Sequence, residues 1–263
     1  MTPKNHFDIA MQRADHLLRL YELLHDTRSY KVRKDWATKF RDLMHWPKNE
    51  TIVRVDGKDR NSFLILREAA EIDRDKFTHD YLAELLRATV VATVSALDRY
   101  MHDIVVFHSW TLLTRAESKI PKELRKLHVP VLAARHAIDK IRSDATARPG
   151  VLVKEALREQ LHRDYTFQNS DDVLKAAQML GIKDFWREVA KLMSGKPTNE
   201  EVVKKLQEIA RRRNQIVHEA DILRKAKSKT VSMREISAKT AVEWSGWMKD
   251  FVAAVDAVIS NSI

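Results

Sequence analysis

An arginine and a histidine five residues apart, Arg213 and His218, are the side chains in this sequence best placed to do chemistry. Histidine titrates near neutral pH and can accept or donate a proton. Arginine offers a rigid fork that matches a phosphate group. Asn214 follows the arginine and precedes the histidine by four residues, so on a helix it can hydrogen-bond along the same flank. This combination suits proton transfer beside a phosphate, a chemistry that needs no metal when RNA is attacked by its own 2′-hydroxyl.

The bare spacing is common, and the chain itself repeats it at Arg74 and His79. That copy lies in the charge-rich run EIDRDKFTHD, where an exposed arginine and histidine need no special reason. A third candidate, Asp98 with His102, forms an i, i+4 pair on a helix otherwise made for burial. For this pair a structural hydrogen bond is the favoured interpretation over a catalytic role.

The segment around Arg213 reads as a helix with a well-marked start. Thr198 and Glu201 have the spacing of a capping box, so we expect the helix to run from there to Asp221. One apolar stripe follows the helical period and contains Val202, Leu206, Ile209, Ile216 and Ala220. Arg213 falls in the middle of that stripe. Because an unpaired buried arginine is costly, the pattern indicates that Arg213 either has a partner or faces a second surface.

Arg213 and His218 cannot form one compact site on a single straight helix, because five residues place them about 140° apart around its axis. A groove between two such helices would collect the arginine and the histidine of both copies. A partner subunit would therefore resolve the mismatch.

Composition indicates a nearly all-helical protein. The 263 residues include only five glycines and six prolines, and 44% of the chain is hydrophobic, which is ample for a core. The net charge of +10 suits an anionic partner such as nucleic acid, although a solvated cationic surface fits equally well. The absence of cysteine excludes disulfides, zinc ribbons and thiol nucleophiles. No histidine spacing is typical of a metal site, so we expect neither metal nor cofactor.

Periodicity and capping signals divide the chain into helices. The ranges expected to be helical are 5–27, 34–45, 78–113, 131–143 and 150–166, then two short helices closed by Gly181 and Gly195, with Ser170 or Asp171 capping the first and Asp184 the second. The 78–113 helix is apolar nearly all round, which makes it central to the fold. Residues near Asp56 and Gly57 fit either a short hairpin or a loop, and helicity is expected to return near Ser62. A second capping box, Ser232 with Glu235, should open the last helix.

Four basic residues flank the motif and are candidates for contacts with an RNA backbone: Arg211, Arg212, Lys225 and Lys227. The two lysines lie in the run ILRKAKSKT, for which a solvated loop is the alternative. No apolar run approaches the ~20 residues that cross a bilayer, and no signal peptide is recognisable. We therefore expect a soluble, cytoplasmic protein.

The chain resembles known proteins in three separated blocks. They are ATVSALDRYMHDIV, FQNSDDVLKAAQMLGIKDFW and RRRNQIVHEAD. Together they resemble the RiboL-PSP-HEPN family, a branch of the HEPN superfamily of helical ribonucleases, from about Leu82 to the carboxyl end. The resemblance implies an all-α HEPN-type helical bundle with a long central helix and additional N-terminal helices. Residues 61–263 would form the HEPN-like ribonuclease domain, and residues 1–60 an N-terminal helical extension.

The resemblance also implies an activity. HEPN enzymes are metal-independent endoribonucleases, often toxins or effectors of antiphage defence, that dimerise with their motif helices facing each other. By position, the family's catalytic arginine, polar residue and histidine correspond to Arg213, Asn214 and His218. Ala220 stands where toxins paired with small nucleotidyltransferases carry a tyrosine, which weakens the expectation of such an antitoxin. Whether an antitoxin or sensor restrains the chain stays open, and a non-catalytic RNA-binding module or a dimerisation scaffold is the alternative function.

Overall fold

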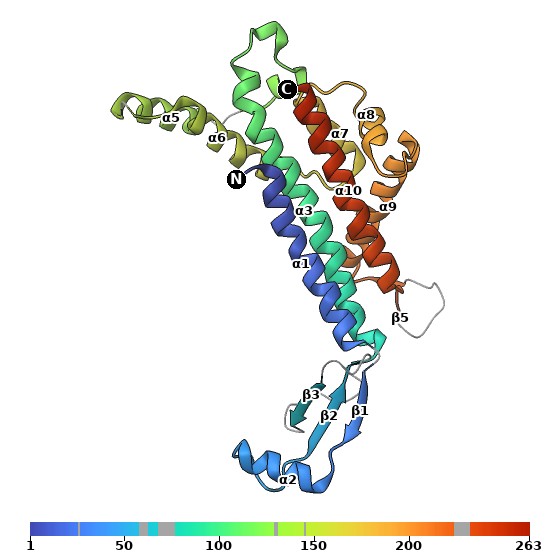
Figure 1. The fold of residues 1–263 in the computed structure, drawn as a ribbon. Helices are drawn as coiled ribbons and strands as arrows, with labels where there is room; N and C mark the ends of the chain where they lie inside the picture. The colour runs from blue at the N-terminus through green and yellow to red at the C-terminus, as the bar shows by residue number, and fades with distance from the viewer. Residues whose placement is uncertain (26, 58–62, 68–76, 129–130, 145, 224–231) are drawn as a thin grey trace.

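Three long helices form the centre of the protein, in the computed structural model that describes residues 1–25, 27–57, 63–67, 77–128, 131–144, 146–223 and 232–263. They are α1 (Pro3–Leu24), α3 (His79–Leu113) and α10 (Ala238–Ser262), and Figure 1 shows them side by side. Their shared core includes Phe7, whose ring meets that of Tyr100 edge-on at 5.9 Å between centroids. The expected all-α fold with a long central helix is confirmed. Thr78 occupies the N-cap of α3, next to the predicted start.

Helix α1 packs into this core. Phe7, Met11 and Ala14 are at most 1% exposed and belong to the same apolar cluster as the inner faces of α3 and α10. On the outside, Lys249 of α10 pairs with Asp15 of α1 at 2.7 Å. The contacts of α1 therefore cross the boundary at residue 60 that was expected between the N-terminal extension and the HEPN-like domain.

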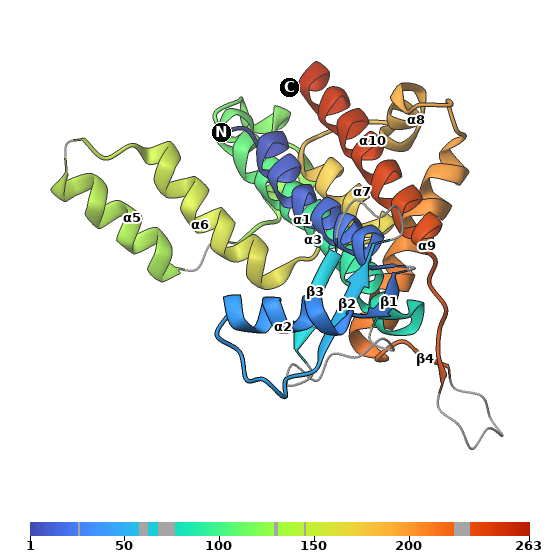
Figure 2. The same ribbon diagram turned by 60° about the horizontal axis from the view of Figure 1, so that its bottom comes forward.

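A small antiparallel sheet is inserted between α1 and α3 and lies at one end of the bundle (Figures 1 and 2). It contains β1 (Arg28–Lys31), β2 (Ile52–Asp56) and β3 (Phe63–Arg67) in the order β1-β2-β3, with α2 (Lys34–Leu43) between the first two strands. Arg54 pairs with Ile65 across β2 and β3, so the hairpin alternative is confirmed. The prediction that helicity returns near Ser62 is wrong, because the short apolar run FLILR pairs as a strand. Periodicity alone does not distinguish such a run from a helix.

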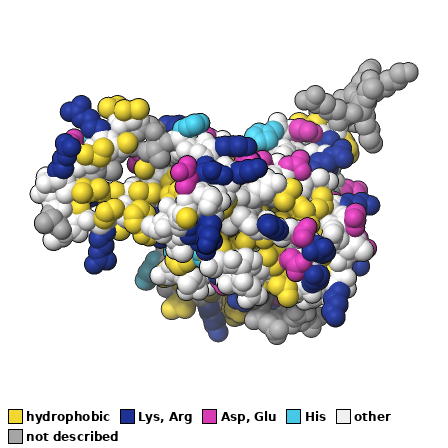
Figure 3. All heavy atoms as spheres, turned by 90° about the horizontal axis from the view of Figure 1, so that it is seen from above, with side chains coloured by type: hydrophobic (Ala, Val, Ile, Leu, Met, Phe, Trp, Pro, Cys, Tyr) yellow, Lys and Arg dark blue, Asp and Glu magenta, His cyan; other side chains and the backbone are white. Residues whose placement is uncertain are grey.

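Helices α5 (Val131–Ser143) and α6 (Pro149–Asp164) form an arm beside the bundle and confirm the helices expected there (Figure 2). The 3-10 turn η3 (Glu117–Lys119) and the short α4 (Lys122–Arg125) lead into it. Apolar side chains gather on the arm in Figure 3. The large apolar residues of the arm that are exposed include Val131, Leu132, Ile138, Ile141 and Val151.

Two short helices, α7 (Ser170–Met179) and α8 (Phe185–Leu192), precede α9 (Asn199–His218). Gly181 and Gly195 follow them with φ of +76°, a conformation that glycine adopts without strain, as expected for residues that end helices. The cap of α7 is Asn169, one residue earlier than predicted, since its Oδ1 accepts from the backbone N–H groups of Asp171 and Asp172 at 3.0 Å. Asp184 holds the N-cap position of α8 as predicted, without a side-chain cap bond.

The last helix begins later than predicted. Ser237 caps α10 by accepting from the N–H of Thr240 at 3.0 Å. Ser232 lies instead in β5 (Ser232–Met233), which pairs with β4 (Ile222–Leu223), so the second capping box is wrong. Within the described ranges, no helix has the length and apolarity that a membrane span requires.

Candidate active site

Helix α9 starts where the sequence predicted. The Oγ1 of Thr198 accepts from the N–H of Glu201 at 3.2 Å, and Glu201 Oε2 accepts from the N–H of Thr198 at 2.7 Å. Along the inner face, Val202, Leu206 and Ile209 are at most 1% exposed and pack into the bundle core. The capping box and the first half of the apolar stripe are therefore confirmed, and they fix the rotation of the helix about its axis.

The end of α9 departs from the prediction, which extended the helix to Asp221. The last helical residue is His218, and the chain then turns through two successive left-handed residues, Ala220 (φ 48°) and Asp221 (φ 55°). Ala220 is exposed and does not continue the apolar stripe. The turn swings Asp221 inward, and His218 is left exposed at the end of the helix.

A buried ion-pair cluster holds this turn in place. Asp221 is only 1% exposed, and its carboxylate accepts from Arg87 Nε of α3 at 2.6 Å. The same carboxylate is paired with the guanidinium of Arg212, whose Nη2 lies 2.8 Å from Oδ2. Arg87 and Arg212 also donate to the backbone carbonyl of Arg234. Arg212 thus has internal partners, in a position where a contact with RNA was expected.

Arg213 has a different environment from its neighbour. Its side chain is half-buried, and its Nη1 donates to Asn214 Oδ1 at 3.1 Å. Its Nε is buried without a hydrogen-bond partner, and no carboxylate of the described residues pairs with it. A buried guanidinium nitrogen without a partner is costly, since the group loses its water and gains nothing in return. This geometry agrees with the expectation that Arg213 has no ion-pair partner within its own chain.

The surface of α9 between Arg213 and His218 is open. Asn214 and Val217 lie within the ~140° sector that separates the arginine from the histidine, as the period of the helix requires. Both are exposed, and 45% of the Val217 side chain is accessible. One chain therefore places Arg213 and His218 on either side of an exposed strip and does not bring them together.

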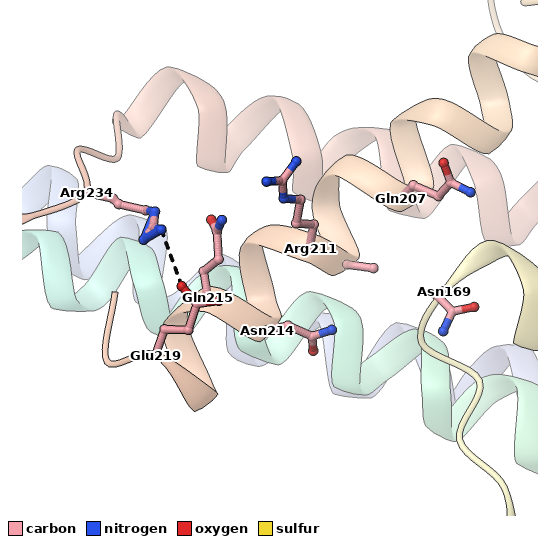
Figure 4. Close-up of a pocket in the computed structure, with 8 residues that line it drawn as sticks. Asn169, Gln207, Arg211, Asn214, Gln215, Glu219 and Arg234 are labelled. Atoms are coloured by element: carbon pink, nitrogen blue, oxygen red, sulfur yellow. Dashed lines mark hydrogen bonds and ion pairs between the residues drawn. The ribbon is translucent and has the colours of Figure 1, made fainter. Parts of the chain in front are cut away.

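A polar hollow of about 380 Å³ adjoins this strip (Figure 4). Its lining comes from the loop before α7, from α9 and from the segment before α10, and comprises Asn169, Gln207, Ala210, Arg211, Asn214, Gln215, Glu219 and Arg234. At its rim Arg234 and Glu219 form an ion pair at 3.3 Å. The expected RNA contact Arg211 thus lies beside the motif residue Asn214. Lys225 and Lys227 lie outside the described residues.

The other candidate pairs have structural environments. Arg74 lies outside the described residues, and His79 Nδ1 is 2.8 Å from the hydroxyl of Tyr21. Asp98 accepts from the N–H of Phe167 at 2.5 Å, and its Oδ1 lies 3.6 Å from Nε2 of His102. Burial lowers the pKa of His102, which stacks on His162. Asp98 thus has a structural role in holding the segment at Phe167, but at 3.6 Å the expected hydrogen bond between Asp98 and His102 is not formed.

Comparison with known proteins supplies the remaining evidence. No cluster of three or more potential metal-ligating side chains exists among the residues that the structure describes. Neither the curated proteins nor the solved structures contain a match to the chain. The model of the RiboL-PSP-HEPN family matches residues 60–261, which include α3, the motif helix α9 and nearly all of α10. The chain, with its helical bundle built around α3 and the Arg213 to His218 motif on α9, therefore belongs to the RiboL-PSP-HEPN family.

Proposed function

We propose that the protein is a metal-independent endoribonuclease whose active site is composed from two copies of α9 in a homodimer. Arg213, Asn214 and His218 are its catalytic residues. The observation that carries the proposal is the environment of the Arg213 side chain. Its Nε is buried without a hydrogen-bond partner, and among the described residues its guanidinium bonds only to its neighbour Asn214. Nε itself is closed to a ligand, so the donors that a phosphate would bind are the outer nitrogens of the guanidinium, of which Nη1 reaches Asn214 and none is paired with a carboxylate of the described residues.

The chemistry follows from the three side chains. In RNA the 2′-oxygen bonds to the adjacent phosphorus while the bond from phosphorus to the 5′-oxygen breaks. The 2′-hydroxyl must lose a proton, and the leaving 5′-oxygen must gain one, which are the two tasks of an imidazole near neutral pH. Arg213 would stabilise the charge that develops on the phosphorane oxygens. Asn214, through its bond to Nη1, would hold the guanidinium in position.

Dimerisation would bring the separated groups together. In one chain the exposed strip of Asn214 and Val217 lies between the arginine and the histidine. If two copies of α9 meet along this strip, the Arg213 of one chain approaches the His218 of the other across the two-fold axis. Val217 would then lose its exposure to water, which favours association.

A purified protein and a labelled single-stranded RNA in excess EDTA test the proposal. The wild type should cleave the RNA, whereas Arg213→Ala and His218→Ala should fold and dimerise but lose at least about a hundredfold in rate, because each removes a group that acts in the transition state. Full activity of the His218→Ala variant would refute the assignment.

The physiological role that we propose is that of a toxin or antiphage effector. Its direct test is expression in growing cells, where the wild type should arrest growth and the His218→Ala variant should not. The alternative function is a non-catalytic RNA-binding module, which is favoured by the separation of Arg213 and His218 within one chain. Such a module would give salt-sensitive RNA binding without cleavage in the same assay.

A further inference from the structure

A second face of α9 continues from His218 away from the proposed dimer strip. Gln207, Arg211 and His218 follow spacings of four and seven residues, which place them within about 40° of one another around the helix. Arg211 lies seven residues before His218, or about 10 Å along the axis. A strand of RNA that reaches His218 can therefore extend along this face to Arg211.

Arg211 stands between two hollows in the surface. The first, of about 380 Å³, is the polar hollow of Figure 4, which Asn169 and Asn214 line on one side of Arg211. The second, of about 490 Å³, lies on the other side and is lined by Lys204 and Trp244. Gln207 and Gln215 border both hollows together with Arg211. The arrangement is a ridge that carries one guanidinium, with a cavity on each flank.

The groups along this ridge have capacity for further hydrogen bonds. The side chain of Arg211 is exposed and forms no hydrogen bond or ion pair with another described residue. The side chain of the adjacent Arg212, in contrast, is paired with Asp221. Gln207 uses its amide nitrogen to donate to Ser170 Oγ at 2.9 Å. This bond ties α9 to the start of α7 and orients the Gln207 amide, whose oxygen is the part still able to accept from a ligand.

We propose that this ridge and its two hollows bind two successive nucleotides of single-stranded RNA, with Arg211 on the phosphate between them and one unpaired base in each hollow. The inference rests on the proposed function and states where the RNA substrate would bind. The guanidinium fork matches a phosphate. Carboxamides such as those of Gln207 and Gln215 offer a donor and an acceptor to the edge of a base. A duplex turns its bases inward and cannot fill the hollows, so the site selects single strands.

Binding can be measured apart from cleavage in the His218→Ala background, by fluorescence anisotropy with a labelled single-stranded RNA of mixed sequence. Arg211→Ala should weaken binding roughly tenfold, the loss expected for one charge-assisted contact. It should also flatten the plot of log affinity against log salt by about 0.7, the change for one phosphate contact to a single strand. Arg158→Ala is the matched control, since Arg158 is an exposed arginine on α6 that lines neither hollow.

Two further measurements test the bases. Gln207→Leu keeps the size of the side chain but removes the amide, so it should weaken binding severalfold and leave the salt dependence unchanged, because no charge is lost. A perfect duplex of the same sequence should compete at least about tenfold less well than the single strand. Thermal melting shows whether each variant remains folded, since Gln207→Leu also loses its bond to Ser170.

Equal affinity and equal salt dependence for Arg211→Ala and Arg158→Ala would overturn the inference, as would equal competition by the duplex. The two proposals fail separately. If the wild type cleaves RNA but Arg211→Ala binds it normally, the path of the strand is wrong and the activity stands. If Arg211→Ala loses binding while the His218-containing protein never cleaves RNA, the binding site stands and the nuclease does not.

Discussion

Arg87 Nε donates to Asp221 Oδ2 at 2.6 Å across 134 residues of sequence, and this bond attaches the end of the motif helix to the central helix α3. Arg87 and Asp221 are 5% and 1% exposed. Since His218 lies three residues before Asp221, the bond anchors the chain just after the histidine. The end of α9 that bears His218 is thus held by two buried residues.

Replacement of Asp221 by Asn should destabilise the protein by about 3 kcal/mol, because it removes the buried charge that Arg87 and Arg212 share and leaves Arg87 with only the exposed carboxylate of Glu84. Denaturant unfolding measures the change. The control is Glu84→Gln, which removes another carboxylate partner of Arg87, at 2.9 Å, but one whose side chain is 62% exposed. That variant should lose at most about 0.5 kcal/mol. Similar losses in both variants would contradict the importance given to burial.

A single cysteine at position 217 should report the proposed dimer. The chain contains no cysteine, so Val217→Cys introduces a unique thiol in the strip between Arg213 and His218. A short bifunctional maleimide should link two chains through it in high yield, as seen on a denaturing gel. Val242→Cys on α10 is the control, since Val242 is 47% exposed against 45% for Val217. Preferential cross-linking through position 242 would place the interface elsewhere.

Arg213→Lys should separate the charge of the arginine from its shape. Lysine keeps the positive charge but lacks the planar fork and cannot contact a phosphate through two parallel bonds. We expect kcat to fall at least about tenfold while the melting temperature stays near that of the wild type. Single-turnover cleavage of a labelled RNA measures the rate. Wild-type activity in the lysine variant would mean that Arg213 acts by charge alone.

Acid should destabilise the protein through His102. Burial lowers the pKa of His102 from 6.5 in the folded state, Asp98 opposes the effect, and His162 adds to it. Below pH 6.5 the unfolded chain therefore binds more protons than the folded one at this residue, so stability falls as pH falls. The melting temperature should drop between pH 7.5 and 5.5.

In the His102→Phe variant, the melting temperature should fall less steeply between pH 7.5 and 5.5. His108 has a pKa lowered by its burial and by Lys154, and it contributes in the same direction, so some of the slope should remain. The exposed His136 supplies the control: His136→Gln should leave the pH dependence unchanged. An equally steep drop in His102→Phe would show that this buried imidazole does not control the response.

The sequence predicted those parts of the fold that local signals determine. Thr198 and Glu201 cap α9 because both partners lie within one turn, so their spacing contains the whole interaction. Ser232 and Glu235 have the same spacing but do not cap a helix. Ser232 pairs with Leu223 in a strand, a contact from outside the local window. The run at Phe63 became a strand for the same reason, since β2 was its partner.

The site was predictable only in part, for a similar reason. Arg213 stands out in the sequence because it interrupts an apolar stripe, and its partnerless Nε agrees with that signal. Arg212, one residue earlier, gave no local sign that it would be bound by Asp221. Asp221 lies just past the helix, and Arg87, its other partner, is a residue of α3 with ordinary helical surroundings in the sequence. A buried ion pair between distant segments has no periodic pattern that would disclose it.

The packing of α1 bears on how the protein can be shortened. The family match begins at residue 60, yet Phe7, Met11 and Tyr21 fill one side of α3 and are almost inaccessible to water. A fragment cut at that boundary would present a bare apolar seam along the middle of its longest helix. Such a fragment should self-associate and precipitate, so a shortened version that stays in solution must keep the first helix even though the family match starts after it.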